Sequence, residues 1–240
     1  MGRQSPLAKH ALYLGTILHD WGHTEEEVSV RLAKALALCK ALRPIWATKS
    51  LEAKVAVRVL RSCVFSSLIY GLHTMVFTNS QEKRIDGMQI RCIRRALGIK
   101  STYADKLLGR EATSNREVAE LVDAKPLSAG IRKMRYQMLG HVLRREGSDP
   151  LRAVSFDRLG QPKALSGNRR AAATRKNWSV EVMKEAEAVL RGQGALKTAG
   201  NSPTGNPCYQ IAKLAQNREA WRKLVNTWYK SVTVEDYYAG

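Results

Sequence analysis

The chain has 240 residues, of which 44 % are hydrophobic, so it is long and apolar enough for one large domain or two small ones. Lys and Arg number 40 against 21 Asp and Glu, which leaves a formal net charge of +19. Such a surplus repels itself unless an anion neutralises it, so nucleic acid is the leading class of partner and a membrane surface the second.

Neither the cysteines nor the N-terminus indicates secretion. The four cysteines stand far apart without a CxxC pair, which disfavours a zinc knuckle or ribbon and is typical of reduced core residues in an intracellular protein. The first fifteen residues lack the apolar core of a signal peptide, and we expect no run of membrane-spanning length. The sequence therefore predicts an intracellular protein that binds no membrane.

The N-terminal region predicts a short strand or hairpin followed by a helix. Apolar residues alternate over 12–18, and 20–22 form a turn signal. Thr24 and Glu27 then match a capping box, and we expect the glutamates there to stabilise the start of a helix rather than to bind a metal. Pro44 should end that helix.

Two more helices are predicted before residue 100. The first runs from Ser50 to Tyr70 and carries a basic stripe, Lys54, Arg58 and Arg61. Its inward face is expected to contain Val55, Val59, Cys63 and Leu68. The second covers 79–98, where Asn79 and Glu82 can cap the start and Gly98 suits the left-handed residue that ends a helix. Its apolar residues recur at helical spacing: Ile85, Met88, Cys92, Ile93 and Ala96. Three arginines share another face, Arg84, Arg91 and Arg95, and Arg94 flanks it. Taken alone, this pattern also fits an amphipathic helix with a solvated basic face.

The C-terminal half predicts further basic helices. We expect a strongly basic helix over 128–145, an irregular connector over 146–167 and a helix rich in Ala, Lys and Arg over 168–191. The composition of 192–207 is that of a flexible linker. A last amphipathic helix is predicted over 209–229.

No self-contained active site is expected. Polymerase or nuclease chemistry needs carboxylates that converge on a metal pair, and the aspartates here stand apart. His19 and His23 bracket Asp20, but in a turn and without an HExxH pattern. We therefore predict no catalytic residue, no metal site, no cofactor and no small-molecule substrate.

The candidate nucleic-acid-binding residues are the cations of the predicted helices. Aromatic residues are interleaved with them between 128 and 178 and could stack on bases, although core packing is the stronger expectation for Tyr136 and Trp178. Solubility alone is the competing explanation for the cations. The candidate set is Lys54, Arg58, Arg61, Arg84, Arg91, Arg94, Arg95, Arg132, Lys133, Arg135, Arg144, Arg145, Arg169, Arg170, Arg175 and Lys176.

Short motifs follow one another along the chain: YLG at 13–15, LRPIW at 42–46, IYG at 69–71, IRCIRRALGI at 90–99, RYQMLGHVLR at 135–144 and NREAWRKLV at 217–225. In this order they resemble the thumb and C-terminal extension of non-LTR (LINE, RTE-type) retrotransposon reverse transcriptases, which carry "LLYG", "RCLRRILGI", "RWLGHVLR" and "DRxxWRxLV". The basic stretch 167–178 keeps the frame of their "GKRRRGRP…W", but three alanines at 171–173 replace Gly-Arg-Pro and favour a helix there.

The resemblance implies a mainly α fold: a thumb-like helical bundle with a short N-terminal β-hairpin and a basic helical C-terminal extension. Its segments would be the end of a palm over 1–23, the bundle over 24–126, the extension over 127–191, the linker over 192–207 and a C-terminal helix over 208–240 packed on the extension.

The function that the resemblance implies is non-catalytic. The chain would be a fragment of an RNA-directed DNA polymerase that grips the template–primer duplex and element RNA, because the palm with its metal-binding aspartates would lie before Met1. It would act in the nucleus or in a cytoplasmic ribonucleoprotein. A helical protein-interaction module, whose charge only confers solubility, and a decayed retroelement reading frame are the alternatives.

Overall fold

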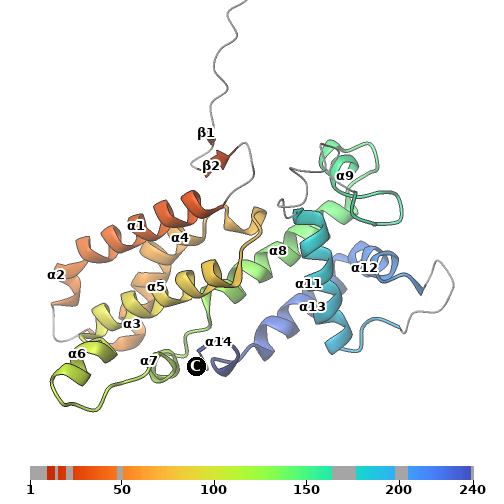
Figure 1. The fold of residues 1–240 in the computed structure, drawn as a ribbon. Coiled ribbons are helices and arrows are strands. Elements are labelled where there is room, and N and C mark those ends of the chain that lie inside the picture. Colours follow the sequence, from red (N-terminus) through yellow and green to blue (C-terminus); the bar gives the residue numbers. More distant parts are fainter. Residues whose placement is uncertain are drawn as a thin grey trace, which may run out of the picture. The chain divides into compact units, whose positions relative to one another are not determined.

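The computed structural model describes residues 10–13, 16–19, 24–47, 51–163, 177–197 and 205–238. These residues are mainly helical, which confirms the predicted fold class (Figure 1). The chain divides into two compact units. Unit 1 comprises Met1–Gly71 and Phe77–Ala124, and unit 2 comprises Leu72–Val76 and Lys125–Gly240.

The first described residues of unit 1 form a hairpin, in which β1 (His10–Tyr13) pairs antiparallel with β2 (Thr16–His19). The stretch 12–18, which was predicted as one strand before a turn at 20–22, is therefore divided between two strands. The turn predicted at 20–22 lies outside the described residues. The helical elements of unit 1 are α1 (Glu25–Ala41), α2 (Arg43–Trp46), α3 (Ala53–Val59), the π-helical turn η1 (Leu60–Phe65), α4 (Ser66–Ile69), α5 (Asn79–Leu97), α6 (Thr102–Leu107) and α7 (Asn115–Leu121).

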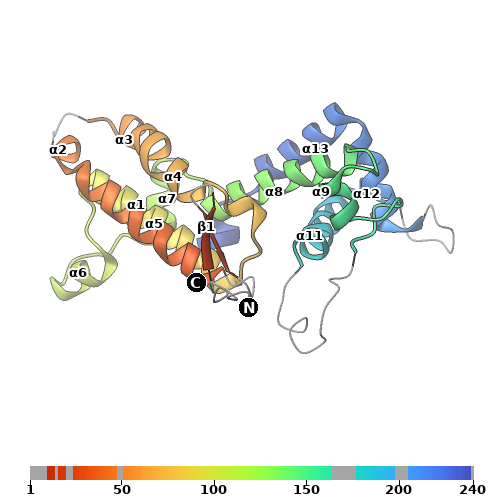
Figure 2. The same cartoon turned by 90° about the horizontal axis from the view of Figure 1, so that it is seen from above.

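Helices α1 and α5 lie side by side at the centre of unit 1, as Figures 1 and 2 both show. Glu25 pairs with Arg84 near their N-terminal ends, and the Cys39 thiol contacts the Cys92 carbonyl oxygen nearer their C-terminal ends, so the two helices run in the same direction. The apolar stripe predicted for 79–98 is confirmed, because all its members are buried except the half-buried Met88. The core between the helices consists of Val28, Leu32, Ala35, Cys39, Ile85, Cys92 and Ile93.

The helix caps differ from those predicted. At α5 the N-cap is Thr78, and Gln81 completes the capping box one residue earlier than expected. At α1 no capping box forms: Thr24 has a helical rather than an extended backbone, and its hydroxyl donates a hydrogen bond to Gln81. The Glu27 carboxylate is buried instead and accepts hydrogen bonds from the Ile17 amide at 2.8 Å and from Arg31 at 2.5 Å. The glutamate expected to cap α1 therefore ties the hairpin to it.

The helix predicted from Ser50 to Tyr70 is interrupted by the π-helical turn η1. Its buried side follows a four-residue spacing, Ala56, Leu60, Val64 and Leu68. The prediction that Val55 and Cys63 face inward is wrong: Val55 is 40 % exposed, and the Cys63 side chain is exposed as well. The buried series is offset by one residue from the predicted one, and the offset begins at Ala56, before the π-helical turn.

One stretch of the described residues, Ala53–Thr74, has the length and apolarity of a membrane-crossing helix, with a mean hydropathy of 1.5. The expectation that no run reaches this length is therefore wrong. The stretch supplies core residues to unit 1 and packs against α1 and α5, and buried core helices meet the same criterion.

Unit 2 contains η2 (Leu72–Thr74), α8 (Leu127–Arg144), α9 (Pro150–Ser155), α11 (Trp178–Gly192), α12 (Pro207–Gln216), α13 (Arg218–Ser231) and α14 (Glu235–Tyr238). The single helix predicted over 209–229 is two helices, because Asn217 takes an extended conformation and its side chain caps α13 by accepting a hydrogen bond from the Ala220 amide. The predicted helical residues 168–176 and most of the predicted linker, 198–204, lie outside the described residues.

Helix α8 is the centre of unit 2 and contacts α11, α12, α13 and η2. The Trp221 indole lies directly over Gly140, where an added Cβ would come within 2.3 Å of the ring nitrogen. That indole donates a hydrogen bond to the Tyr136 carbonyl oxygen at 3.0 Å. The short segment before α5 is bound to the same unit, because Trp178 donates to the His73 carbonyl oxygen at 3.0 Å.

Candidate nucleic-acid interface

The cations predicted on α8 are engaged by protein groups. Arg135 is 1 % exposed, and its guanidinium donates to both oxygens of Glu185, at 2.7 and 2.9 Å, and to the Met75 carbonyl oxygen at 2.8 Å. A buried guanidinium with three such partners cannot reach a phosphate without leaving them unpaired. Arg135 is therefore a structural residue of unit 2, and we remove it from the candidate set.

The other α8 candidates also have partners within unit 2. Arg144 is half-buried and donates to the Ala215 carbonyl oxygen at 3.0 Å, and Arg145 pairs with Asp149 at 2.5 Å. Arg132 and Lys133 lie over the rings of Tyr237 and Tyr229, at 6.0 and 4.5 Å from the ring centroids. In such contacts the aliphatic part of the side chain packs against the protein while the charged group lies over an aromatic ring. Helix α8 therefore serves mainly in packing.

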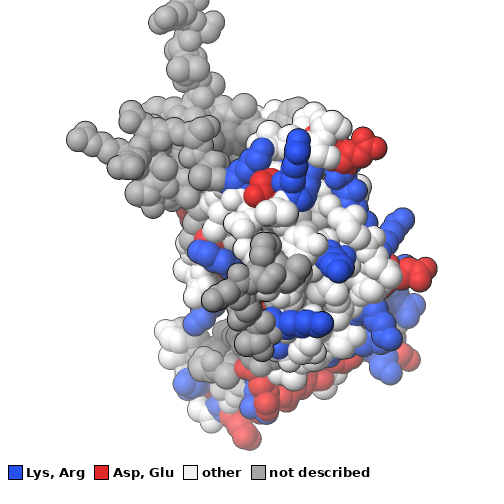
Figure 3. All heavy atoms as spheres, turned by 90° about the vertical axis from the view of Figure 1, so that its right-hand side faces the viewer, with Lys and Arg blue, Asp and Glu red and all other residues white. Residues whose placement is uncertain are grey.

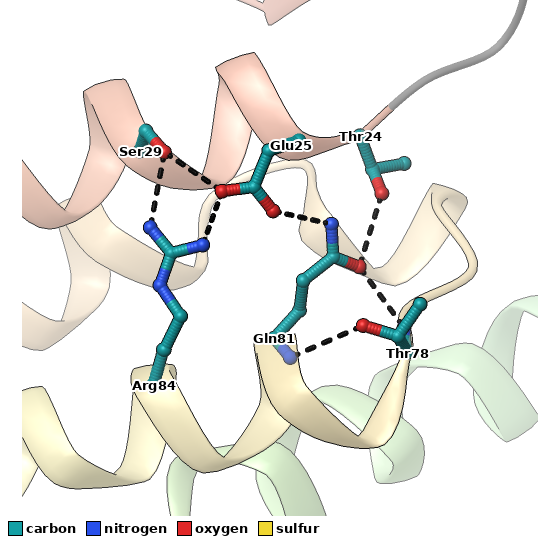
Figure 4. A network of polar contacts seen from close by, with 6 residues as sticks. All are labelled: Thr24, Glu25, Ser29, Thr78, Gln81 and Arg84. Atoms are coloured by element: carbon teal, nitrogen blue, oxygen red, sulfur yellow. Dashed lines mark hydrogen bonds and ion pairs between the residues drawn. The ribbon is translucent and has the colours of Figure 1, made fainter.

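The four candidate arginines of α5 differ in their burial and in the groups that they contact. Arg84 contributes to a network between α1 and α5, shown in Figure 4, in which its guanidinium donates to Glu25 and, at 3.0 Å, to the Ser29 hydroxyl oxygen. The hydrogen bond from Arg84 lowers the pKa of the Glu25 carboxyl, and a second one from Gln81 lowers it further. Arg84 therefore joins two helices and is not a free cation.

Arg94 is buried, with 7 % of its surface exposed. Its guanidinium donates to the carbonyl oxygens of Lys100 at 2.7 Å and Thr113 at 2.6 Å, and to the Asn115 side chain at 3.2 Å. It thus fastens the segment that leads from α5 through α6 to α7. Burial lowers the pKa of Arg94, and the nearby carboxylates of Asp105 and Glu117 oppose that shift.

Arg91 and Arg95 are exposed on α5, as Arg84 is, but they border pockets. Both line a pocket of about 510 Å³ that the guanidinium-anchored Arg94 and the polar residues Ser101, Thr102 and Asn115 also border. Arg95 lines a second pocket as well, of about 570 Å³, together with Lys40, Arg43, Trp46 and Ala47. Of the three arginines expected to share a face, Arg91 and Arg95 line one pocket, whereas Arg84 pairs with Glu25 of α1. We call the set Lys40, Arg43, Trp46, Arg91 and Arg95 the Arg95 surface.

The Arg95 surface is electropositive. The described residues that line its two pockets include no carboxylate. Cations that converge without acidic partners form a favourable site for an anion.

The remaining candidates are distributed elsewhere. Lys54, Arg58 and Arg61 are exposed on α3 and η1, and Arg61 donates to the Asp123 carbonyl oxygen at 3.4 Å. Arg169, Arg170, Arg175 and Lys176 lie outside the described residues. Figure 3 views the molecule from the side where α9 and α12 lie in Figure 1, and shows Lys and Arg spread among uncharged residues rather than gathered into one band.

Comparison with protein-family models, curated proteins and solved structures gives no match. The geometry of the chain itself therefore carries the functional argument.

Sequence reasoning missed three members of the Arg95 surface, Lys40, Arg43 and Trp46. The position of Pro44 in the sequence could have predicted that they lie close together. It ends α1 and begins the short helix α2, so the residues on either side of it gather at one helix end instead of spreading along a helix. Lys40 stands in the last turn of α1, and α2 packs against α5, where Arg95 lies.

Proposed function

We propose that this protein binds nucleic acid without catalysing a reaction, and that the Arg95 surface of unit 1 holds the phosphate backbone. The Arg95 surface is the single observation that carries the proposal. Cations from α1, α2 and α5 converge there on two pockets that share Arg95, and no carboxylate among the described lining residues neutralises them.

The chemistry of this surface suits a polyanion better than one small anion. Two adjacent openings with a common guanidinium offer successive positions for phosphates, while Ser101, Thr102 and Asn115 supply polar groups at one of them. Contacts to phosphates position a nucleic acid without reading its sequence. The formal charge of +19 adds long-range attraction for the same partner.

We further propose that the chain is the thumb and C-terminal extension of a non-LTR retrotransposon reverse transcriptase, the family that its ordered motifs resemble. In that setting unit 1 would grip the template–primer duplex, in the nucleus or in a cytoplasmic ribonucleoprotein. The motif IRCIRRALGI supports this proposal, because it contains Arg91, Arg95 and Gly98, and Gly98 closes α5 in the left-handed conformation.

The proposal is tested by a charge-matched pair of variants. The double variant Arg91→Gln/Arg95→Gln removes two cations of the Arg95 surface, and Lys83→Gln/Arg110→Gln removes two exposed cations of unit 1 that line neither pocket. Both variants have the same net charge. Binding to a fluorescent RNA–DNA hybrid is measured by anisotropy.

An exposed contact between unit charges is worth about 1 kcal/mol in water, so losing two should weaken hybrid binding about 30-fold. The control should change affinity about threefold or less. Equal losses in the two variants would show that net charge alone drives binding, and an absence of hybrid binding by the unaltered protein would overturn the proposal.

A protein-binding module is the second candidate function, because α6 exposes apolar side chains. Tyr103, Leu107 and Leu108 are 72 %, 69 % and 55 % exposed. Exposed apolar residues that cluster on one element are typical of protein contact sites. Replacing all three with Ser should leave hybrid binding unchanged if the Arg95 surface is the functional site.

A further inference from the structure

The pocket beside Trp46 differs from its neighbour in having an aromatic wall. Its volume of about 570 Å³ lies in the range of ligand sites, and Lys40, Arg43 and Arg95 surround the indole. The neighbouring pocket of about 510 Å³ has arginines and polar groups but no aromatic side chain among its described lining residues. The two pockets therefore suit different parts of a nucleic acid.

The Trp46 ring is held in place. Its indole nitrogen donates a hydrogen bond to the Cys39 carbonyl oxygen at 3.0 Å, at the C-terminal end of α1. Pro44 at the start of α2 restrains the backbone that carries the ring, and α2 packs against α5. The ring is half-buried, so one part contacts the protein while another borders the pocket. A fixed, partly exposed indole is prepared for stacking.

Stacking on an indole requires the face of a base that is not already covered. Bases inside a duplex are stacked on one another, so a duplex presents only phosphates and base edges to a protein. An unpaired nucleotide offers its flat face to an aromatic side chain and its phosphate to nearby cations. The Trp46 pocket has both partners, the indole and the three cations around it.

We infer that the Trp46 pocket binds an unpaired nucleotide of a single strand, next to the duplex phosphates held at Arg91 and Arg95. Because Arg95 borders both pockets, a strand that leaves the duplex at Arg95 enters the Trp46 pocket with its next base. The preferred ligand of unit 1 is accordingly a junction between duplex and single strand. This inference rests on the proposed binding of nucleic acid by the Arg95 surface.

The experiment compares three probes with the full chain: a blunt RNA–DNA hybrid, the same hybrid with a single-stranded dT overhang, and that hybrid with an overhang of abasic sites. The abasic overhang keeps the phosphates and removes the bases. Stacking of one base contributes enough to predict a roughly 5- to 150-fold preference for the dT overhang over the abasic one.

Two substitutions at Trp46 separate stacking from folding. Trp46→Leu should reduce the preference for the dT overhang over the abasic overhang to less than twofold. Trp46→Phe keeps an aromatic ring, so it should retain most of the preference but lose the tryptophan fluorescence quenching that the dT overhang causes. Tyr103→Leu is the control, because it removes a 72 % exposed aromatic residue of unit 1 that lines neither pocket.

The outcomes are distinct. If the unaltered protein binds the dT and abasic overhangs equally, or if Trp46→Leu keeps the preference, the inference is overturned while salt-dependent binding of the blunt hybrid still supports the proposed function. If circular dichroism shows that Trp46→Leu is unfolded, the preference of the unaltered protein and the quenching lost in Trp46→Phe decide the question. If the protein binds none of the three probes, the proposed function and the inference both fail.

Discussion

Arg94 and Arg95 are adjacent residues of α5 with opposite predicted roles. Replacing Arg94 with Met should lower the free energy of unfolding without weakening nucleic-acid binding by the folded fraction. Arg95→Met should weaken nucleic-acid binding and leave the free energy of unfolding nearly unchanged. Arg94 is 7 % exposed and donates three hydrogen bonds, at 2.7, 2.6 and 3.2 Å. Arg95 is exposed and borders two pockets.

The magnitude for Arg94 follows from its partners. A hydrogen bond to a charged donor contributes about 1.5–3 kcal/mol, and the effects of several bonds from one group are not additive. Because Met fills part of the vacated space while two carbonyl oxygens lose their donor, we expect a destabilisation of about 2–4 kcal/mol. Arg95→Met should change stability by less than about 0.5 kcal/mol, as is typical of a surface substitution.

Urea denaturation followed by far-ultraviolet circular dichroism measures the stability, and anisotropy with the RNA–DNA hybrid at low urea measures binding. The reasoning is refuted if Arg94→Met retains full stability and loses affinity as Arg95→Met does. That result would place the Arg94 guanidinium on the ligand and not on the segment between α5 and α7.

Three further predictions concern unit 2. Gly140→Ala should destabilise the protein by about 1–3 kcal/mol, because its Cβ would meet the Trp221 ring at 2.3 Å. Gly130→Ala, in the same helix and with nothing within 4 Å of the added Cβ, should stabilise the protein by about 0.5–1 kcal/mol. Thermal denaturation measures both effects. Arg135→Met should cost about 3–5 kcal/mol because a buried ion pair loses one partner, and unchanged stability in urea denaturation would show that the pair is dispensable. Burial and, to a smaller extent, the charge of Arg135 lower the pKa of His73 below its ordinary value of 6.5, so in acid the unfolded chain binds more protons than the folded one. The free energy of unfolding should therefore decline as the pH falls below 6.5 towards the folded pKa. His73→Gln should remove this pH-dependent part of the stability.

The buried face and the end of a helix could be predicted from the sequence where residue spacing within the helix determines them. The stripe of α5 from Ile85 to Ala96 predicted which face is buried, and Gly98 predicted where the helix ends, with φ +68°. Arg91 and Arg95, four residues apart, line one pocket as helical geometry predicts, whereas Arg84, which was grouped with them, pairs with Glu25 of α1 instead.

Arginines that serve packing were harder to separate from those that face solvent. Arg135 lies four residues from both Ile131 and Leu139, which are buried, so its place in the apolar stripe of α8 was visible in the spacing. For Arg94 the determining contacts come from the segment at 100–115, which folds back over α5. No periodicity within α5 contains that information.

The segment that runs from α3 through η1 to α4 illustrates a second limit. The valines at 55 and 59 were expected to face the core. The buried face is offset by one residue and follows Ala56, Leu60 and Val64, and this offset begins in α3, before the π-helical turn. Only the packing of the segment against α1 and α5 selects that alternative.

The most direct test of the account is the salt dependence of hybrid binding by the unaltered protein and by Arg91→Gln/Arg95→Gln. Each phosphate contact contributes about 0.9 to the slope of log affinity against log salt concentration, so the double variant should have a slope smaller by about 1.8. The charge-matched Lys83→Gln/Arg110→Gln should keep the slope of the unaltered protein. A slope that is flat, or that falls equally in both variants, would contradict the claim that the Arg95 surface holds the phosphate backbone.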